Sequence, residues 1–446
     1  MARLLSITVG IKSHLYSHLA AARQTRRMGH IPAIASPNAG IRSDVEHAGV
    51  EFIPLRPAEG TWRSAPYRGG IRGWLGGHDF VAERRKAILS GAGVPQAAER
   101  FGPDLTIIDS ELHEHILVSH LSGCPTASIE FHLSTSRKPN VPVLSQFYLP
   151  EDTLISKLRC NLDWQHMLAR RRLGRMLRKW TTFGLDKHST LEALAQRSGV
   201  RLHDLVDTGQ WQYYAFPGIP CLRATVPQMD FAPEAARENE WFVGPLILEA
   251  KHRLYCDDSL QRCVGFLDSR PAEDPFIILS LGSIITSRRV IRDAIAAVKG
   301  KPVSLIISTG TEKDTTLTPN LPGNVLAEPW LPLKELLPRA QVMIGHGGVA
   351  TIHECIDAHV PLLLYSLGTM DMNGNVARVH AKGLGIAGSE NDSADDMWRH
   401  IERLLTEEHF RDRCRDMAET FKRYSDAGLR NALAVCLGEG PSTADR

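Results

Sequence analysis

The chain has 446 residues, of which 43% are hydrophobic and 23% are charged. This composition is ordinary for a globular protein, and the length predicts two domains. The formal net charge is +2 and the isoelectric point is near 8.1, so the charge balance gives no reason to expect a nucleic-acid partner.

The first third of the chain alternates strand-like and helix-like segments. A buried strand is predicted over 4–11, followed by a helix over 17–29 that ends at a glycine. Strands separated by helices indicate βαβ units and a parallel sheet. Further strands are predicted over 31–36, 50–55, 103–109 and 125–131, with helical segments over 43–49 and 114–123.

The middle of the chain is less regular and contains one basic amphipathic segment. Residues 168–180 (LARRRLGRMLRKW) place Leu173, Met176, Leu177 and Trp180 on one helical face, with the basic residues elsewhere. The segment is either a solvated surface helix or a peripheral contact with an anionic membrane in which a lipophilic acceptor resides.

The alternation resumes after a proline-punctuated stretch that suits a connector. The predicted fold class is α/β, with two Rossmann-like domains whose parallel sheets face each other across an interdomain cleft. We expect a first domain over 1–226, a linker over 227–246 and a second domain over 247–446, whose last helix could pack back on the first domain. In the second domain, strands are predicted over 276–283, 302–308, 324–330, 341–348, 361–365 and 383–388, and helices over 286–299, 350–358 and 373–382.

The eight cysteines are scattered, with no C-x-x-C and no zinc-site spacing. They indicate reduced thiols in a cytoplasmic protein. No apolar run approaches the length of a membrane-spanning helix, and the N-terminal segment lacks the long apolar core of a secretory signal. We therefore expect a cytoplasmic location.

Several residues suited to ligand binding follow predicted strands of the second domain. Ser283, Trp330, His346 and Asp371 all lie at or just beyond the carboxyl ends of such strands. In open parallel sheets, ligands bind beyond these ends. The four positions are therefore expected to surround one site.

The segment 346–348 (HGG) leads into a helix that begins near Val349. Glycines let the backbone approach a ligand, and the amino end of a helix suits a phosphate. Glu354 could then accept hydrogen bonds from ribose hydroxyls, and Asp371 from a sugar. Each feature also has an ordinary interpretation: a turn, a solvated helix residue and a helix cap. Only their joint spacing favours a nucleotide-sugar site.

The same stretch resembles the nucleotide-sugar signature of GT-B glycosyltransferases that use UDP-sugars, a family that includes plant natural-product, macrolide and carotenoid glycosyltransferases. The family pattern is a tryptophan followed by H-x-G, T-x-x-E, G-V-P and D-Q-x-x-N-A-x-R. This chain has Trp330, HGG at 346–348, TIHE at 351–354, HVP at 359–361 and DMNGNVAR at 371–378. The resemblance covers nearly the whole chain, since SLGS and WFVGPL also match the family's style.

The resemblance implies how a UDP-sugar donor would bind. Trp330 would stack on the uracil, Glu354 would bind the ribose, and Asp371 would bind sugar hydroxyls. The pyrophosphate would be held by Ser283, His346 and the backbone of the helix start. The implied donor-binding residues are Ser283, Trp330, Leu331, His346, Gly348, Val349, Ala350, Thr351, Glu354, Asp371 and Met372.

Met372 departs from the family pattern, which has glutamine at this position. The glutamine contacts sugar hydroxyls, whereas a thioether cannot donate a hydrogen bond. Glucose is the default expectation and a deoxy sugar stays open, with Asn373 as a partial substitute. UDP and dTDP also stay open, because uracil and thymine present the same stacking face.

Transfer to a hydroxyl needs a general base, for which histidine is suited near neutral pH. The stretch from His14 to His30 resembles the family's H-x-x-P-x-x-x-L-A-x-x-L-x-x-x-G-H, in which the first histidine is the base. This register assigns the role to His14, in the loop after the first strand, with His18 as its rival. Ser17 replaces the family's proline.

Asp109, at the end of a predicted strand, matches the family's partner acid for that base. Such an acid fixes the tautomer of the histidine and stabilises its protonated form. Asp109 could equally cap the following helix. Glu111 and His113 are expected to line the acceptor cleft.

The resemblance implies an inverting hexosyltransferase that acts on a hydroxyl of a hydrophobic small-molecule natural product. No D-x-D motif occurs in the chain, so neither a metal nor another cofactor is expected. Two other functions stay open: an NDP-sugar epimerase of GT-B architecture, and a non-catalytic sugar-nucleotide-binding partner protein. The protein could be a monomer or a homodimer.

Overall fold

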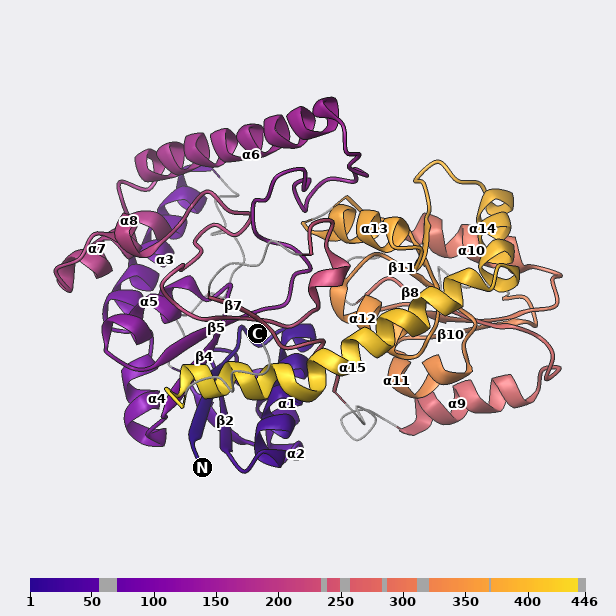
Figure 1. The fold of residues 1–446 in the computed structure, drawn as a ribbon, viewed down its shortest axis with the longest axis horizontal. Helices are drawn as coiled ribbons and strands as arrows, with labels where there is room; N and C mark the ends of the chain where they lie inside the picture. Colours follow the sequence, from indigo (N-terminus) through magenta and orange to yellow (C-terminus); the bar gives the residue numbers. More distant parts are fainter. Residues whose placement is uncertain are drawn as a thin grey trace.

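The computed structural model shows two α/β domains side by side (Figure 1). It describes residues 1–55, 70–233, 239–248, 257–282, 287–310, 321–368 and 370–439; for 70–79 and 257 only the backbone is described. Within these ranges no helix is long and apolar enough to cross a membrane. The seven cysteines within them are all unpaired thiols.

The first domain is built on a seven-stranded parallel sheet with the order β3-β2-β1-β4-β5-β6-β7. Its central strands are buried on both faces by helices, which explains their nearly continuous apolar sequences. The strands are β1 (Arg3–Ile7), β2 (Ile31–Ser36), β3 (Glu51–Pro54), β4 (Leu105–Asp109), β5 (Thr126–Glu130), β6 (Cys221–Arg223) and β7 (Glu240–Phe242). The helices are α1 (Lys12–Arg27), α2 (Arg42–His47), α3 (Gly70–Leu89), α4 (Val94–Phe101), α5 (His113–Leu121), α6 (Leu154–Thr181), α7 (Lys187–Arg197) and α8 (Leu202–Leu205).

The second domain has a six-stranded parallel sheet with the order β10-β9-β8-β11-β12-β13. Two apolar clusters fill the space between this sheet and the helices on its two faces. The strands are β8 (Phe276–Ser280), β9 (Ser304–Ser308), β10 (Val325–Glu328), β11 (Val342–Gly345), β12 (Leu362–Leu364) and β13 (Gly385–Ala387). The helices are α9 (Asp257–Asp268), α10 (Arg288–Val298), α11 (Leu333–Leu336), α12 (Val349–Asp357), α13 (Met372–Ala381), α14 (Ala394–Thr406) and α15 (His409–Cys436).

Two boundaries differ from the sequence predictions. Residues 240–242 lie in the range expected to be linker, yet they form β7 at the edge of the first sheet. Helix α1 begins at Lys12, so His14 lies in its first turn and not in a loop. The start was missed because the N-cap residue is Ile11, which offers no capping side chain.

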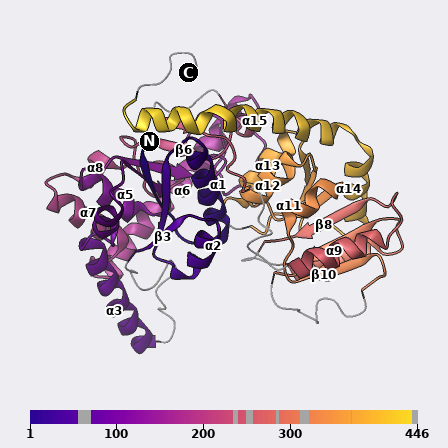
Figure 2. The ribbon, with the colours of Figure 1, turned by 90° about the horizontal axis from the view of Figure 1, so that it is seen from below.

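The last helix joins the two domains. Helix α15 runs from the second domain along the side of the first, as Figure 2 shows. The ring of Tyr424 meets that of Phe242 in β7, with centroids 6.4 Å apart. Leu429, Ala432 and Leu433 then enter the apolar core of the first domain. The C-terminal half of α15 is therefore part of the first domain's packing.

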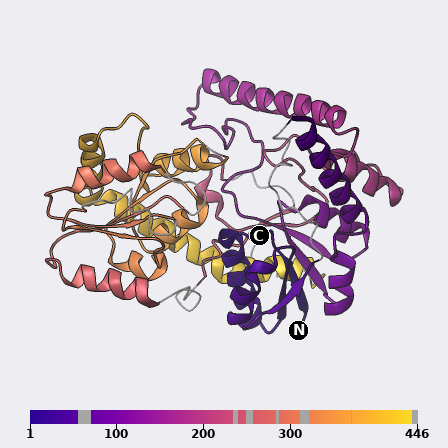
Figure 3. The same cartoon turned by 180° about the vertical axis from the view of Figure 1, so that it is seen from behind.

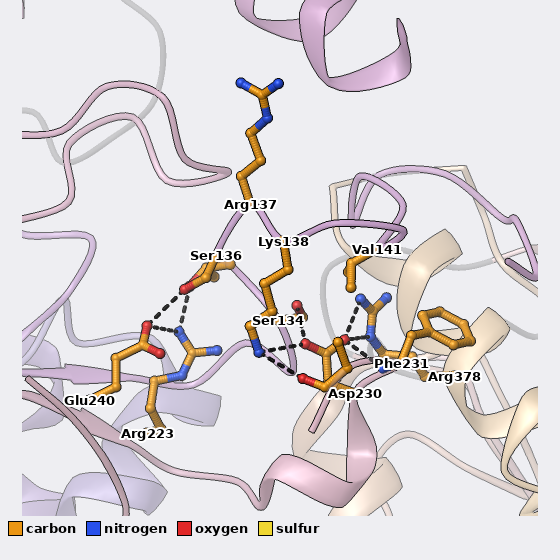
Figure 4. Close-up of polar contacts among 12 residues, drawn as sticks. Ser134, Ser136, Arg137, Lys138, Val141, Arg223, Asp230, Phe231, Glu240 and Arg378 are labelled. Carbon is orange, nitrogen blue, oxygen red and sulfur yellow. Dashed lines mark hydrogen bonds and ion pairs between the residues drawn. The ribbon is translucent and has the colours of Figure 1, made fainter. Parts of the chain in front are cut away.

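A buried ion pair also connects the domains. Arg378 of α13 is fully buried, and its Nε and Nη2 donate to Oδ1 of Asp230 at 3.0 and 2.8 Å. Oδ2 of Asp230 accepts from Ser134 Oγ at 2.8 Å and from Lys138 Nζ at 3.3 Å (Figure 4). The pKa of Asp230 is lowered, because Arg378 and Lys138 outweigh the opposing effect of burial.

The loop before α6 lies directly on the start of α13. The amide of Gly374 donates to the carbonyl of Leu144 at 2.8 Å, and Asn373 Nδ2 donates to the carbonyl of Ser145 at 3.0 Å. A Cβ at position 374 would lie only 2.2 Å from the oxygen of Leu144. This close approach brings the expected sugar-binding residues next to the first domain.

Candidate active site

The loop after β11 holds an imidazole ring between two glycines. His346 follows the strand, and a Cβ on Gly282 or Gly348 would lie 2.8 Å from an atom of its ring. Gly347 has φ +96°, a conformation that other residues adopt only with strain. Burial lowers the pKa of His346, with Asp371 and the backbone of Ser280 partly offsetting the effect. The ring is therefore neutral at pH 7.

Asn375 organises this loop, and the sequence analysis gave it no role. It is fully buried, and its Nδ2 donates to the carbonyl of Gly347 at 2.9 Å and to Oδ2 of Asp371 at 2.8 Å. Asp371 is the N-cap residue of α13, but its side chain makes no capping hydrogen bond. Capping therefore does not account for Asp371. The asparagine of the DMNGNVAR segment was the available signal.

Helix α12 begins at the same loop. Its N-cap is Gly348, and the backbone of Val349, Ala350 and Thr351 forms its first turn. The unpaired amides and the dipole of such an end favour an anion. Glu354, on the next turn, is only 5% exposed, so the interpretation of a solvated helix residue is wrong.

Four donor candidates remain. Trp330 follows β10 and is half-buried, with its carbonyl accepting from Ser259 Oγ at 2.9 Å. The side chain of Leu331 lies in the apolar core. Met372 opens α13, and its backbone packs against Gly347. Ser283 lies outside the described residues.

In the first domain, His14 and Asp109 form a buried pair. Asp109 ends β4, and its Oδ2 lies 2.6 Å from Nδ1 of His14. Asp109 is fully buried, while the side chain of His14 keeps 13% of its surface exposed. Burial alone would lower the pKa of His14, but the charge and hydrogen bond of Asp109, together with Glu111, raise it above its ordinary value.

Asp109 does not cap the next helix, because α5 has Leu112 as its N-cap. Its Oδ1 instead accepts from the amide of Glu111 at 3.1 Å. His18, the rival base, is fully buried, and burial lowers its pKa to about 4. Neither ring nitrogen of His18 has a hydrogen-bond partner within the described part of the chain. His14, with its exposed edge, is thus the better placed of the two.

A second histidine–carboxylate pair lies beside the first. Nδ1 of His132 lies 2.5 Å from Oε1 of Glu130, and Nε2 lies 3.9 Å from Glu111. Burial opposes the charged form, but Glu130, Asp371 and Glu111 raise the pKa of His132 to about 10. Glu130 also accepts from Gln212. This pair was not predicted, although E-F-H at the end of a predicted strand was a signal.

These charges connect the two halves of the site. Asp371 raises the pKa of His132 in the first domain and that of His346 in the second. His132 in turn affects the pKa of His14. Asp371 of the second domain and His132 of the first therefore influence each other electrostatically across the interdomain contact.

Glu111 and His113, the two residues expected to line the acceptor cleft, lie in different surroundings. Glu111 faces His14 and His132 and keeps a raised pKa, chiefly because it is buried. His113 instead lies 3.0 Å from Lys187 Nζ and packs edge-on against the ring of Tyr214. Burial and Lys187 lower the pKa of His113 well below its usual range.

A cavity of about 340 Å³ lies in the first domain. Ser110 of its wall follows Asp109, and Gln212 of its wall bonds to Glu130. Ile116, Phe216 and Tyr214 give it apolar surface, and Arg223 and Glu240 add a charged pair that Ser136 also joins (Figure 4). This size and mixed lining are typical of small-molecule sites.

Two parallel sheets with a site between their carboxyl ends define the GT-B class, as the sequence predicted. Solved structures support this fold. A kitacinnamycin glycosyltransferase has a TM-score of 0.67 and 18% identity, covering 97% of this chain and 98% of its own. The calicheamicin glycosyltransferase CalG4 has a TM-score of 0.64 and 19% identity, covering 98% and 99%.

Sequence relatives define the activity more closely. Residues 292–424 match the family described as erythromycin biosynthesis protein CIII-like, C-terminal domain. The chain is similar to 4'-demethylrebeccamycin synthase of Lentzea aerocolonigenes, with 24% identity over 92% of this chain and 93% of the relative. It is also similar to aclacinomycin-T 2-deoxy-L-fucose transferase of Streptomyces galilaeus, with 22% identity over 92% and 90%. The predicted resemblance to GT-B glycosyltransferases is thus confirmed, and the epimerase alternative is not favoured.

Proposed function

We propose that this glycosyltransferase moves a hexose from a UDP- or dTDP-sugar to a hydroxyl of a hydrophobic small-molecule natural product, with inversion at the anomeric carbon. The observation that carries the proposal is the His14–Asp109 pair, in which a buried carboxylate bonds to one ring nitrogen of a histidine that stays partly exposed. Among the similar structures, VinC was solved with dTDP and SpnG with spinosyn aglycone.

His14 is the general base of the proposed reaction. Its Nδ1 bonds to Asp109, which leaves Nε2 for the acceptor hydroxyl. As the acceptor oxygen bonds to the anomeric carbon, its proton passes to Nε2 and the bond between that carbon and the nucleotide diphosphate breaks. Asp109 stabilises the imidazolium that forms.

The leaving diphosphate is stabilised at the start of α12. The neutral ring of His346, the amides of the first turn and the side chain of Ser283 meet the developing charge, so transfer proceeds without a metal ion. Trp330 and the backbone of Leu331 hold the base, Glu354 the ribose, and Asp371 the sugar hydroxyls. Asn375 positions Asp371 and the Gly347 carbonyl by its two hydrogen bonds.

The acceptor occupies the cavity of the first domain, whose wall residue Gln212 bonds to Glu130. Its apolar walls suit a hydrophobic ring system, and its polar residues suit the hydroxyls or carbonyls that such molecules carry. Glu111 faces this acceptor, whereas His113 supports the wall through Tyr214. Because of Met372, sugars that lack a hydroxyl at the position it contacts are good donors. Their transfer is compared with that of glucose.

A donor and acceptor panel tests the proposal. The protein is incubated with UDP- and dTDP-hexoses, including 2-deoxy sugars, and with polycyclic and macrocyclic alcohols, with and without EDTA. Glycosides are detected by mass spectrometry and their anomeric configuration by NMR. We expect an inverted glycoside that forms in the presence of EDTA. An epimerised donor or a retained anomer would contradict the proposal.

Substitution of the base provides the first specific prediction. His14→Ala should lower kcat by at least roughly 10³-fold while nucleotide affinity stays within about twofold, since the base does not hold the donor. His203→Ala, at an exposed histidine elsewhere in the first domain, is the matched control and should leave both unchanged. Loss of nucleotide binding in His14→Ala would refute the assignment.

A further inference from the structure

Helix α6 presents two opposite apolar faces. Ser156, Cys160, Trp164 and Leu168 recur every four residues and are buried against the first domain. Trp164 fixes the helix, because its Nε1 donates to the carbonyl of Val141 at 2.8 Å. This inner face accounts for the position of α6 along the outside of the domain, where Figure 3 shows it from behind.

The outer face carries an apolar stripe that remains in solvent and is interrupted by Gln165 and His166 in the middle of the helix. It consists of Leu154, Ile155, Leu158, Leu162, Leu173, Met176, Leu177 and Trp180, whose exposed fractions are 57–86%. Half of the large hydrophobic residues that are exposed within the described part of the chain are therefore on this one helix. Single exposed apolar residues are ordinary, but eight of them on one face of one helix mark an interaction surface.

The charge of α6 contrasts with that of the rest of the chain. The helix carries eight of the 52 Lys and Arg residues and one of the 50 Asp and Glu residues, so the remainder of the chain is net acidic. At about 100° per residue, Arg159 and Arg170 lie along one edge of the stripe and Arg172 and Lys179 along the other. An apolar stripe with basic edges fits an anionic surface that has an apolar interior.

We propose that the outer face of α6 is a peripheral membrane-binding surface that lies flat on an anionic lipid bilayer. The apolar side chains enter the boundary between headgroups and acyl chains, and the flanking arginines and lysines contact lipid phosphates. The inner face stays on the protein, so α6 remains parallel to the bilayer.

The contacts of α6 extend this inference to the acceptor, and this step alone rests on the proposed function. Nη1 of Arg171 donates to the carbonyl of Gln210 at 2.9 Å, and its guanidinium lies over the ring of Tyr213 at 4.3 Å. Gln210 lines the cavity of the first domain. A docked α6 therefore places the acceptor cavity next to the bilayer, where hydrophobic acceptors accumulate.

Vesicle flotation tests the surface without requiring turnover. The full chain is floated with phosphatidylcholine vesicles that contain or lack phosphatidylglycerol. We expect binding to the anionic vesicles to exceed binding to neutral ones by at least about tenfold, and to weaken as salt is raised. Leu158→Glu with Leu173→Glu should abolish it, and Arg170→Gln with Arg172→Gln should reduce it several-fold.

The control variant, Arg292→Gln with Lys299→Gln, removes two positive charges from the second domain. It should bind anionic vesicles as the parent protein does. Both α6 variants replace exposed side chains, and circular dichroism confirms that they fold. Absence of parent binding to anionic vesicles, or binding that the α6 variants retain, would overturn the proposal. Dimerisation through α6 without vesicle binding, measured by light scattering with the same variants, would also overturn it. Glycoside synthesis in detergent tests the enzyme separately.

Discussion

The imidazole of His14 has two opposing influences on its protonation. Burial favours the neutral ring that a base requires, whereas Asp109 and Glu111 favour the imidazolium. The net pKa is raised, so a fraction of the enzyme is protonated and inactive near neutral pH. In return, the same carboxylate stabilises the imidazolium that forms when the acceptor is deprotonated.

This balance gives a pH prediction for Asp109→Asn. A base must be neutral, so the rate in the parent should rise with pH through a pKa above 6.5. Without the Asp109 charge, burial dominates, so the acidic limb of the kcat/KM profile should move to lower pH. The plateau should also fall by roughly 10²–10⁴-fold, because the tautomer and the imidazolium lose their support.

Asp104→Asn is the matched control, since Asp104 is an exposed aspartate at the other end of β4 whose carboxylate accepts from the amide of Arg3. It should leave the profile unchanged. If the acidic limb of the kcat/KM profile does not move in Asp109→Asn, a group other than His14 titrates in that limb. His132 would then be the next candidate, because the charge of Glu130 keeps its pKa near 10.

At the scale of elements, helix α13 combines two tasks. Its N-terminal turn carries Asp371 and Met372 toward the proposed sugar position, and Gly374 in the same turn lets the loop around Leu144 lie against the helix. A side chain at 374 would meet the Leu144 carbonyl and its Cα, which are backbone atoms that cannot rotate away. The donor side and the acceptor side of the site therefore meet at a glycine.

Gly374→Ala should separate the loop from α13. The forced shift should lower the free energy of unfolding by about 1–3 kcal/mol, as overpacking does, and raise the KM of both substrates. Gly265→Ala in α9 is the control, because no heavy atom lies within 4 Å of its added Cβ. There the helix propensity of alanine should leave stability unchanged or raise it by up to about 1 kcal/mol. Urea denaturation and steady-state kinetics measure both effects; equal stability of the two variants would contradict the packing argument.

The elements themselves were largely predictable, because apolar strands followed by amphipathic helices leave a periodic signal. The start of α1 was not, since Ile11 gives no capping signal, and β7 was hidden in a short proline-flanked stretch. In the site, Asp371 could be identified from its spacing within the resemblance. Asn375 and Glu130 had local signals, in DMNGNVAR and E-F-H, but their roles come from partners far away in the sequence: the Gly347 carbonyl and Gln212.

At the scale of the whole molecule, several contacts fix one domain against the other. Helix α15 adds apolar packing along one side, and the Asp230–Arg378 pair adds a buried polar contact near α13. The proposed reaction needs His14 of one domain and Asp371 of the other in register, so the geometry of this interdomain contact enters the chemistry. A change at Arg378 should accordingly affect stability and catalysis together.

Arg378→Met should leave Asp230 buried with only Lys138 as a cationic partner, which costs about 3–5 kcal/mol when a buried pair is broken. Asp230→Asn in the same chain removes the uncompensated charge, so the double variant should be less destabilised than the sum of the single variants.

The pKa of Asp230 is lowered in the folded state, so the contribution of the pair is present above the ordinary aspartate pKa. It is lost as the pH falls through the folded-state value. Thermal unfolding of the four proteins at pH 7 and at a pH below the ordinary aspartate pKa measures this coupling. Arg289→Met, which breaks an exposed pair with Asp293, should change stability by no more than about 0.5 kcal/mol. Additive losses, or Arg378→Met with unchanged kcat/KM, would show that the pair neither couples the domains nor holds the two halves of the site in register.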